Sequence, residues 1–324
     1  MSGDRTIVAI ETSDTDELVR IVDGHAAARA WGAMAEVRRR CDEALERGKQ
    51  LWGASEYIRY RFALDAPAEW AGPAVTEGRT RFTLGPLSEV AASTKTWDEL
   101  EPHLAPGPER AMVAHERVVR GEILTDAAVD RTVLELPLEL QPWEPAYPLV
   151  TYRTDRVEVT TPPSSRTRVS SLPEPGAVVD DPEGTRALLA LVEHWVDTSN
   201  GRSQAVCAEG SASQAVAALG LHSAGVGQTD GATALAWMAW AASTGGAHGR
   251  RRGAAIGRFT AWWAAHEIAG LDWPPEPAEF GEAIGELRWF LWTDGTPDLG
   301  WSLSLAVESS AEGVAWALMA LDAD

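Results

Sequence analysis

Apolar residues recur at helical spacing through the first 130 residues of the chain. A capping pattern at residues 13–17 directly precedes an apolar run at residues 18–22, which indicates the start of a helix. The same reasoning predicts further helices from about residue 31 and over residues 87–92, 97–104 and 108–120. We therefore expect residues 1–130 to form a mainly α-helical domain.

Between residues 131 and 180 the pattern changes from helical to alternating. Residues 133–140 and 152–160 alternate apolar and polar positions with period two, which is typical of β-strands. Residues 162–176 are rich in proline and serine, which favours an exposed linker or edge strands. We therefore predict a proline-rich extended or β segment and linker over residues 131–180.

Helical runs return from residue 181 onward. Asp181-Pro182-Glu183 is typical of a helix start, because proline is tolerated in the first turn. We predict a short strand at residues 204–208 and interpret residues 225–231 as a turn between helices. Helices are expected from Asp181 to about Trp195, over residues 211–219 and 230–242, and after Gly249.

Three alternating segments close the chain, separated by turn-forming residues. This arrangement predicts an antiparallel three-strand meander with helices packed on the small sheet. Residues 181–324 are thus predicted as an α+β domain, and the whole chain as α+β, with a helical N-terminal part and a proline-rich β or linker middle. The segments are residues 287–292, 301–307 and 314–321, and the turns are residues 294–298 and 309–313.

The composition is that of a folded protein with a strong negative charge. The 324 residues include 48 Asp and Glu against 28 Lys and Arg, a formal net charge of -20. This charge repels nucleic acids and acidic membranes, so neither is expected as a partner, and it favours a basic partner. Cys41 and Cys207 provide no disulfide framework, and neither a signal peptide nor a long apolar span is visible. A cytoplasmic location is therefore expected.

Residues 245–253 concentrate positive charge within this acidic chain, with Arg250–Arg252 following three glycines and a histidine. Guanidinium groups beside a glycine-rich helix start could bind a phosphate or a carboxylate. Another triplet, Arg38–Arg40, differs because carboxylates lie one turn away, which predicts a self-paired face. The candidate anion-binding residues are His248, Arg250, Arg251, Arg252, Arg258 and Trp262.

The helix predicted around these arginines has three faces at 100° steps. One consists of small residues that let another helix approach, one is bulky and suited to a core, and the third carries cations, with Arg258 one turn before Trp262. In the alternative interpretation, the arginines pair with Glu279, Glu282 or Glu286, or with carboxylates of the N-terminal domain. The faces are Gly253, Gly257, Ala261 and Ala264; Arg252, Ile256, Phe259 and Trp263; and Arg251, Ala255, Arg258, Trp262 and His266.

Other patterns point away from metal and nucleophile chemistry. His266-Glu267 lacks the second histidine of a zinc-binding HExxH pattern, so neither a metal nor a cofactor is predicted. Residues 225–231 have one residue too many for a dinucleotide loop, and Cys207 and Ser211 have no histidine nearby in sequence. The acidic residues between Asp181 and Asp197 are interpreted as solubilising.

Nine of the 15 tryptophans lie beyond residue 236. A dense aromatic core is the expected role, because tryptophan buries a large area. The alternative is an exposed aromatic groove for a ligand or peptide. Trp289 and Trp292 are the better candidates for exposure, because their odd separation on a strand would point them to opposite faces.

Four runs are distinctive: Leu84–Val90, Met112–Gly121, Gln141–Tyr147 and Gly245–Arg258. Together they resemble a family of uncharacterised actinobacterial proteins, a domain of unknown function, and the resemblance extends over nearly the whole chain. It implies a bacterial cytoplasmic protein. It brings no activity, ligand or catalytic residue.

These observations leave two hypotheses open. The first is a non-enzymatic binding or adaptor module, since catalytic patterns are missing; a cytoplasmic protein partner would dock on the C-terminal domain. The second is an anion-recognising enzyme or sensor, in which the arginines hold a small anionic ligand beside Trp262 and His248 acts as acid or base.

Overall fold

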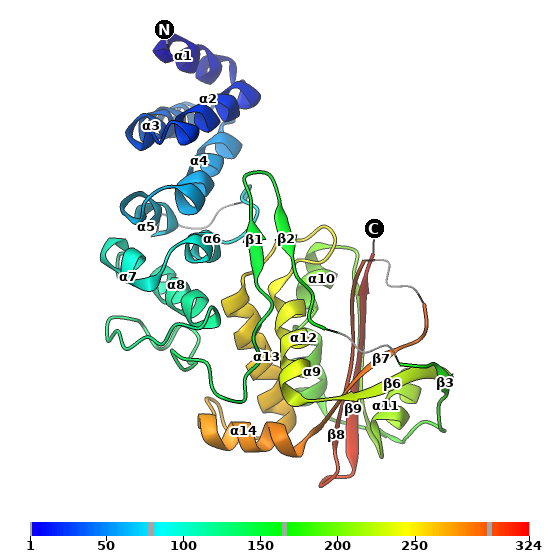
Figure 1. Ribbon diagram of the computed structural model, residues 1–324. Helices are drawn as coiled ribbons and strands as arrows, with labels where there is room; N and C mark the ends of the chain where they lie inside the picture. The colour runs from blue at the N-terminus through cyan, green and yellow to red at the C-terminus, as the bar shows by residue number, and fades with distance from the viewer. Residues whose placement is uncertain (1, 77–80, 164–166, 297–299, 324) are drawn as a thin grey trace. The chain divides into compact units, whose positions relative to one another are not determined.

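A computed structural model describes residues 2–76, 81–163, 167–296 and 300–323 and divides into two compact units (Figure 1). Helices occur together with antiparallel sheets, which confirms the predicted α+β class. Residues 164–166 of the predicted linker and 297–298 of a predicted turn lie outside the described residues. Unit 1 comprises residues 1–117, 124–133 and 150–159, and unit 2 comprises residues 118–123, 134–149 and 160–324.

Unit 1 consists mainly of helices, five of which begin near the predicted positions, whereas those at residues 2–12, 52–65 and 68–76 had no predicted counterpart. Asp14 caps α2, where its side chain accepts a hydrogen bond from the backbone N–H of Glu17 at 3.0 Å. On α3 Arg39 pairs with Glu43, as their spacing predicted. The helices are α1 (Ser2–Thr12), α2 (Thr15–Ala27), α3 (Trp31–Glu46), α4 (Trp52–Asp65), α5 (Ala68–Thr76), α6 (Leu87–Thr94), α7 (Trp97–Leu100), the 3-10 turn η1 (Glu101–His103) and α8 (Pro108–Val119).

A short hairpin completes unit 1. Strands β1 (Val150–Tyr152) and β2 (Val157–Val159) pair antiparallel. Residues 152–160, predicted as one strand, therefore contain a turn, where the N–H of Arg153 donates to the carbonyl of Arg156 at 2.9 Å. The alternation in the sequence identified extended backbone but not the reversal within it.

Unit 2 contains a seven-stranded antiparallel sheet with the strand order β3-β6-β7-β8-β9-β5-β4. The predicted meander is confirmed as β7, β8 and β9 at its centre. The two edge strands have two residues each, so each covers only part of the strand next to it. The strands are β3 (Ser170–Ser171), β4 (Val178–Val179), β5 (Arg202–Glu209), β6 (Ser223–Thr229), β7 (Arg288–Thr293), β8 (Trp301–Ser309) and β9 (Val314–Asp322).

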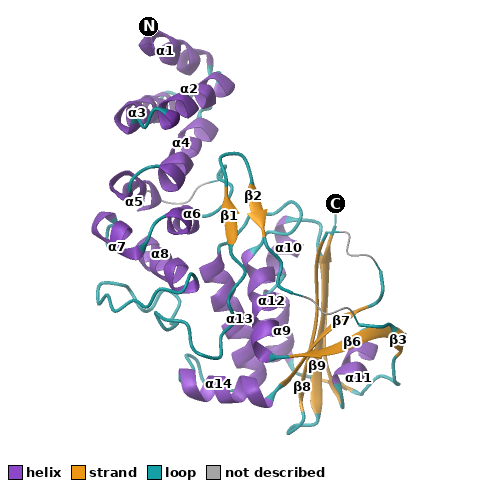
Figure 2. Ribbon diagram, in the orientation of Figure 1, coloured by secondary structure: helices purple, strands orange, loops and turns teal. Residues whose placement is uncertain are grey.

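Helices cover both faces of this sheet. In Figure 2, α9, α12 and α13 lie on one side and α11 lies on the other. Helix α14, which the sequence patterns did not predict, leads into β7. The helices of unit 2 are α9 (Pro182–Ala190), α10 (Glu193–Thr198), α11 (Ala212–Ala218), α12 (Gly231–Ser243), α13 (Ala254–Ala269) and α14 (Pro277–Glu286).

Coverage on both faces corrects the expectation for two tryptophans. Trp289 and Trp292 do point to opposite faces of β7, but only 1% and 6% of their surfaces are exposed. Trp292 packs in the cluster beneath α11, and the indole N–H of Trp289 donates to the carbonyl of Ile284 at 3.0 Å. Both are therefore core residues.

Residues 225–231 were wrongly interpreted as a turn between helices. They form strand β6 as far as Thr229, after which Asp230 caps α12. The glycines here serve close backbone packing, since a Cβ on Gly225 would stand 2.7 Å from the carbonyl oxygen of Thr167. Glycine in a strand often marks such an approach, and without the structure it is easily taken for a turn signal.

Residues 133–140 alternate as predicted but belong to no strand of the described chain. Three leucines are buried and the two glutamates between and beyond them are exposed, so the period of two reflects burial alone. Pro137 has no N–H to donate to a ladder. The carbonyls of Pro137 and Glu139 instead accept hydrogen bonds at 2.9 Å from the guanidinium of Arg258.

Helix α13 is buried on nearly every side, because it packs on α9, α12 and α14. The small-residue face is confirmed as the site of close helix contact, since a Cβ on Gly257 would stand 2.9 Å from the Cβ of Ser243 on α12. The other two faces were interpreted wrongly. The supposed core face is only half-buried, whereas Arg258 and Trp262 on the cationic face are 0% and 1% exposed.

We predict that Gly257→Ala destabilises unit 2 by about 1–3 kcal/mol, because the added methyl would overlap the α12 backbone at Ala239. Gly285→Ala on α14 is the matched control, since nothing lies within 4 Å of its Cβ position. Alanine there should be neutral or stabilising by up to about 1 kcal/mol. Urea unfolding at constant pH measures both, and equal midpoints for the two variants would contradict the close contact.

Candidate functional site

Three of the four candidate arginines, Arg250–Arg252, precede α13 instead of lying on it, whereas Arg258 lies within the helix. Gly253 is the N-cap of the helix, with a φ of 103°, and the backbone N–H groups of Arg252 and Gly253 both donate to the carbonyl of Ser243. A Cβ on Gly245 would collide with the backbone at Arg250, so the loop closes tightly on itself. Residues 244–253 therefore form a compact loop, termed here the arginine loop.

Neighbouring elements of unit 2 hold this loop in place. The carboxylate of Asp322, at the end of β9, accepts a hydrogen bond from the N–H of Ala247 at 2.6 Å. The N–H of His248 donates to the hydroxyl of Ser199 at 3.0 Å. His248 and Arg250 are exposed, whereas Arg251 and Arg252 are half-buried. The loop thus brings four of the six predicted residues together.

The charges around Arg252 are only partly balanced. Burial lowers its pKa from the ordinary value, and the nearby carboxylate of Glu193 opposes that shift. Burial also lowers the pKa of His194, and the positive charge of Arg252 acts in the same direction. His194 therefore lies next to the loop as a largely neutral side chain at pH 7.

The other two predicted residues, Arg258 and Trp262, form a separate buried cluster around Glu144. Arg258 makes a bidentate contact with this carboxylate, with N–O distances of 2.7 and 2.8 Å. The indole N–H of Trp262 donates to it at 2.9 Å, and the phenol of Tyr147 at 2.6 Å. The backbone N–H of Gln141 adds a fourth donor group at 2.9 Å.

Glu144 is a core residue that carries charge. Burial raises its pKa, but the hydrogen bonds and charge of Arg258 outweigh that effect, so its pKa lies below the ordinary value of 4.5. Both side chains of the pair are 0% exposed. Arg258 therefore follows the alternative interpretation, in which an arginine pairs with a carboxylate of the protein itself. Its partner belongs to the 134–149 segment and is not the predicted Glu279, Glu282 or Glu286.

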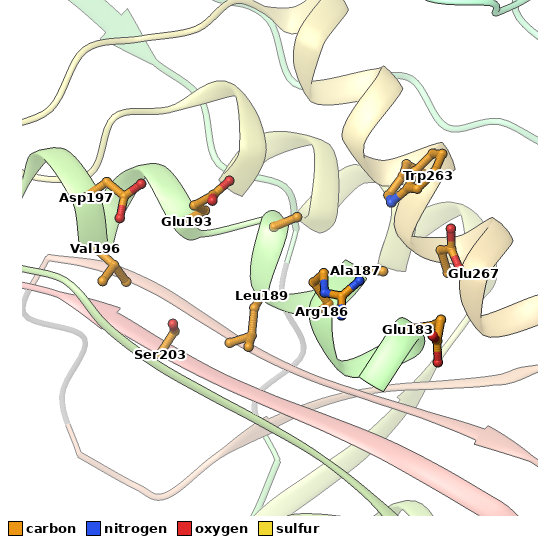
Figure 3. A pocket seen from close by; sticks show the side chains of 11 residues that line it. Glu183, Arg186, Ala187, Leu189, Glu193, Val196, Asp197, Ser203, Trp263 and Glu267 are labelled. Carbon is orange, nitrogen blue, oxygen red and sulfur yellow. The ribbon is translucent and has the colours of Figure 1, made fainter. Parts of the chain in front are cut away.

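A groove opens between α9–α10 and α13, next to strand β5 (Figure 3). Its cavity volume is about 440 Å³. Its apolar wall includes Trp263, Leu189 and Val196, of which Val196 is 43% exposed. The groove is lined by Glu183, Arg186, Ala187, Leu189, Ala190, Glu193, Val196, Asp197, Ser203, Trp263 and Glu267.

Carboxylates dominate the charged lining of this acidic groove. Glu183 comes from α9, Glu193 and Asp197 come from α10, and Glu267 comes from α13, against the single arginine Arg186 among the lining residues. The sequence interpretation treated the first three as solubilising. The spacing of four between Glu193 and Asp197 and between Trp263 and Glu267 was an available signal, but it could not show that residues of α10 and α13 line the same groove.

The described residues contain no group of three or more His, Cys, Asp or Glu side chains placed to hold a metal ion. His266 is 4% exposed and packs between the rings of Trp263 and Trp273, with centroids 5.5 and 5.2 Å away. No helix in the described part of the chain is both long and apolar enough to cross a membrane.

Fold and site define an α+β protein with a helical unit and a sheet-based unit that carries an acidic groove. The chain belongs to a family of unknown function, DUF6183, whose model matches residues 16–324. This match confirms the family resemblance, while the actinobacterial origin stays a prediction. A search of the curated proteins and a search of the solved structures found no match.

We predict that Glu144 makes stability depend on pH in the acid range. Because its folded pKa lies below 4.5, its contribution is present above about pH 4.5 and is lost as the pH falls through the folded value. Glu144→Gln should cost about 3–5 kcal/mol at pH 7, since it leaves a buried guanidinium without its counter-charge. This deficit should shrink as the pH falls toward 3.

Unfolding in urea, measured from pH 7 to pH 3, follows this difference. Glu279→Gln is the control, because Glu279 is an exposed carboxylate on α14 of the same unit. Its stability should track the unmodified protein at every pH. A deficit of Glu144→Gln that stays constant from pH 7 to pH 3 would rule out a charged Glu144 in the core.

Proposed function

We propose that this protein is a non-enzymatic binding module of the cytoplasm, and that its acidic groove holds a basic segment of a protein partner. One observation carries the proposal. Carboxylates from two separate helical elements, Glu193 and Asp197 on α10 and Glu267 on α13, converge on one groove with an apolar wall. Such a lining matches a side chain that combines an aliphatic stem with a cationic head, as lysine and arginine do.

The small free energy of each exposed ion pair favours a partner with several cationic groups over a single small cation. Each exposed ion pair contributes only about 0.2–1 kcal/mol in water. Four carboxylates and the face of Trp263 could engage several cationic side chains at once, and the stems would bury apolar surface against Leu189 and Val196. The net charge of -20 would additionally speed the encounter with a basic partner.

The lining also supports binding over catalysis. Among the described residues that line the groove there is no histidine or cysteine, and the hydroxyl present is that of Ser203 on strand β5. Asp197 and Glu193 are exposed to solvent. General acid–base catalysis usually takes place in sites that are closed to water, whereas these carboxylates are open to solvent.

We predict that the double variant Glu183→Gln/Asp197→Asn weakens binding of an octalysine peptide about 2- to 30-fold, since each carboxylate contributes about 0.2–1 kcal/mol. The control is Glu279→Gln/Glu312→Gln, which changes net charge equally at exposed positions outside the groove. Titration followed by tryptophan fluorescence measures both. Equal affinities of the two double variants, or no binding by the unmodified protein, would contradict the proposal that the acidic groove binds a basic segment.

A second candidate function is recognition of a small anion at the arginine loop. The observation that favours it is the incomplete compensation of Arg252, whose pKa is lowered by burial despite the nearby Glu193. A half-buried guanidinium of this kind gains from a bound phosphate or carboxylate. Arg258 and Trp262 take no part, because Glu144 engages both.

We predict for this candidate that inorganic phosphate at 100 times its Kd raises stability by about 2.7 kcal/mol. Arg252→Gln should abolish the shift, whereas Arg156→Gln, an equal charge change in the exposed β1–β2 turn, should retain it. Thermal unfolding with increasing phosphate gives the answer. A melting temperature independent of phosphate would exclude phosphate as the ligand of the loop.

A further inference from the structure

Strand β5 has an incompletely covered edge next to the acidic groove. On one side, all eight of its residues, Arg202–Glu209, pair with β9. On the other side, β4 pairs only with Cys207 and Ala208, and the N–H of Glu209 donates to the carbonyl of Ala177 at 2.9 Å. Within the described chain, residues 202–206 therefore have a strand neighbour on one side only.

The register shows which backbone groups point to the uncovered side. The N–H of Glu209 points toward β4, and the pairing of β5 with β9 runs without a bulge. Backbone direction alternates along an antiparallel strand, so the N–H and C=O groups of Ser203 and Ala205 point to that same side. No hydrogen bond to these groups occurs among the described residues, and both residues are half-buried.

The side chains of this stretch connect the edge to the groove. Ser203 lines the groove, and Figure 3 shows it on its strand beside Leu189 and Val196. Val206 faces the opposite way, into the cluster beneath α11. A strand added beside Ser203 and Ala205 would therefore place every second side chain on the face that carries the carboxylates of Glu193 and Asp197.

We propose that the basic segment binds as an added β-strand along Ser203–Ala205, with cationic residues at alternate positions directed to Glu193 and Asp197. This inference rests on the function proposed above and specifies its mode of binding. Main-chain hydrogen bonds to the sheet edge supply affinity, and the alternate side chains supply specificity. The five residues 202–206 span about 16 Å, enough for one short strand.

The negative charge of the groove indicates which kind of segment binds along the edge of β5. A second copy of this chain paired through β5 would bring two sets of groove carboxylates together, and like charges at such an interface are unfavourable. A basic extended segment has the complementary charge. The occupant is therefore a lysine- or arginine-bearing segment of another protein and not a second copy.

The test uses three peptides with lysine and threonine at alternate positions. The first is unmodified, the second carries N-methyl groups on every lysine amide, and the third carries them on every threonine amide. In a strand, one of these sets points to the sheet edge and the other points away. We expect one methylated peptide to bind at least 10-fold more weakly than the first, and the other to stay within about 2-fold.

The outcomes separate the two proposals. If both methylated peptides bind like the unmodified peptide, or both weaken equally, strand addition is overturned while the acidic groove stands. If the unmodified peptide does not bind at all, the proposed function fails and this inference fails with it. Titration calorimetry with the full-length protein gives all three affinities.

A variant of the protein, instead of the peptide, tests the same strand edge. Ala205→Pro removes the N–H that points to the uncovered edge and leaves the ladder with β9 intact, a position where proline is tolerated in strands. It should weaken the unmodified peptide about 10-fold, whereas Ala205→Val, which keeps the N–H, should not. Equal affinity of the two variants would overturn strand addition, and if Ala205→Pro fails to fold, the methylated peptides decide.

Discussion

The buried ion pair between Glu144 and Arg258 is the interaction on which the arrangement of unit 2 depends. Two charges removed from water are costly, so the pair is tolerable only if its remaining hydrogen-bonding groups are satisfied. Trp262, Tyr147 and the backbone of Gln141 provide this for the carboxylate. Two backbone carbonyls of the 134–149 segment provide it for the guanidinium. The pair therefore attaches a segment without regular secondary structure to the side of α13.

The same attachment determines the acidic groove. With Arg258 and Trp262 directed toward Glu144, helical geometry turns Trp263 and Glu267 away from that cluster and toward α9. The close approach of α12 at Gly257 prevents α13 from rotating about its axis. The α13 wall of the groove is thus formed by Trp263 and Glu267, which point outward because their neighbours one position earlier point inward.

Local signals predicted much of this fold, since capping and turn chemistry act within a few residues. The caps at Asp14 and Asp181 and the central meander followed from such signals. The partner of Arg258 could not be predicted, because Glu144 lies 114 residues away and a charged side chain normally indicates a solvent-facing position. The strand expected at residues 133–140 failed for a related reason, since a guanidinium occupies carbonyls that a neighbouring strand would otherwise bond.

The acidic groove was missed because identical residue types serve opposite purposes in this chain. Glu144 meets its cation within the protein, so its charge contributes to folding and is inaccessible to any partner. Glu183 and Asp197 are exposed on α9 and α10, where Arg186 offsets only part of the local charge. The formal net charge of -20 includes both kinds of carboxylate and does not distinguish them. The distinction that matters for function is whether the compensating cation is supplied by the chain or must come from another molecule, and only the spatial arrangement of the helices reveals it.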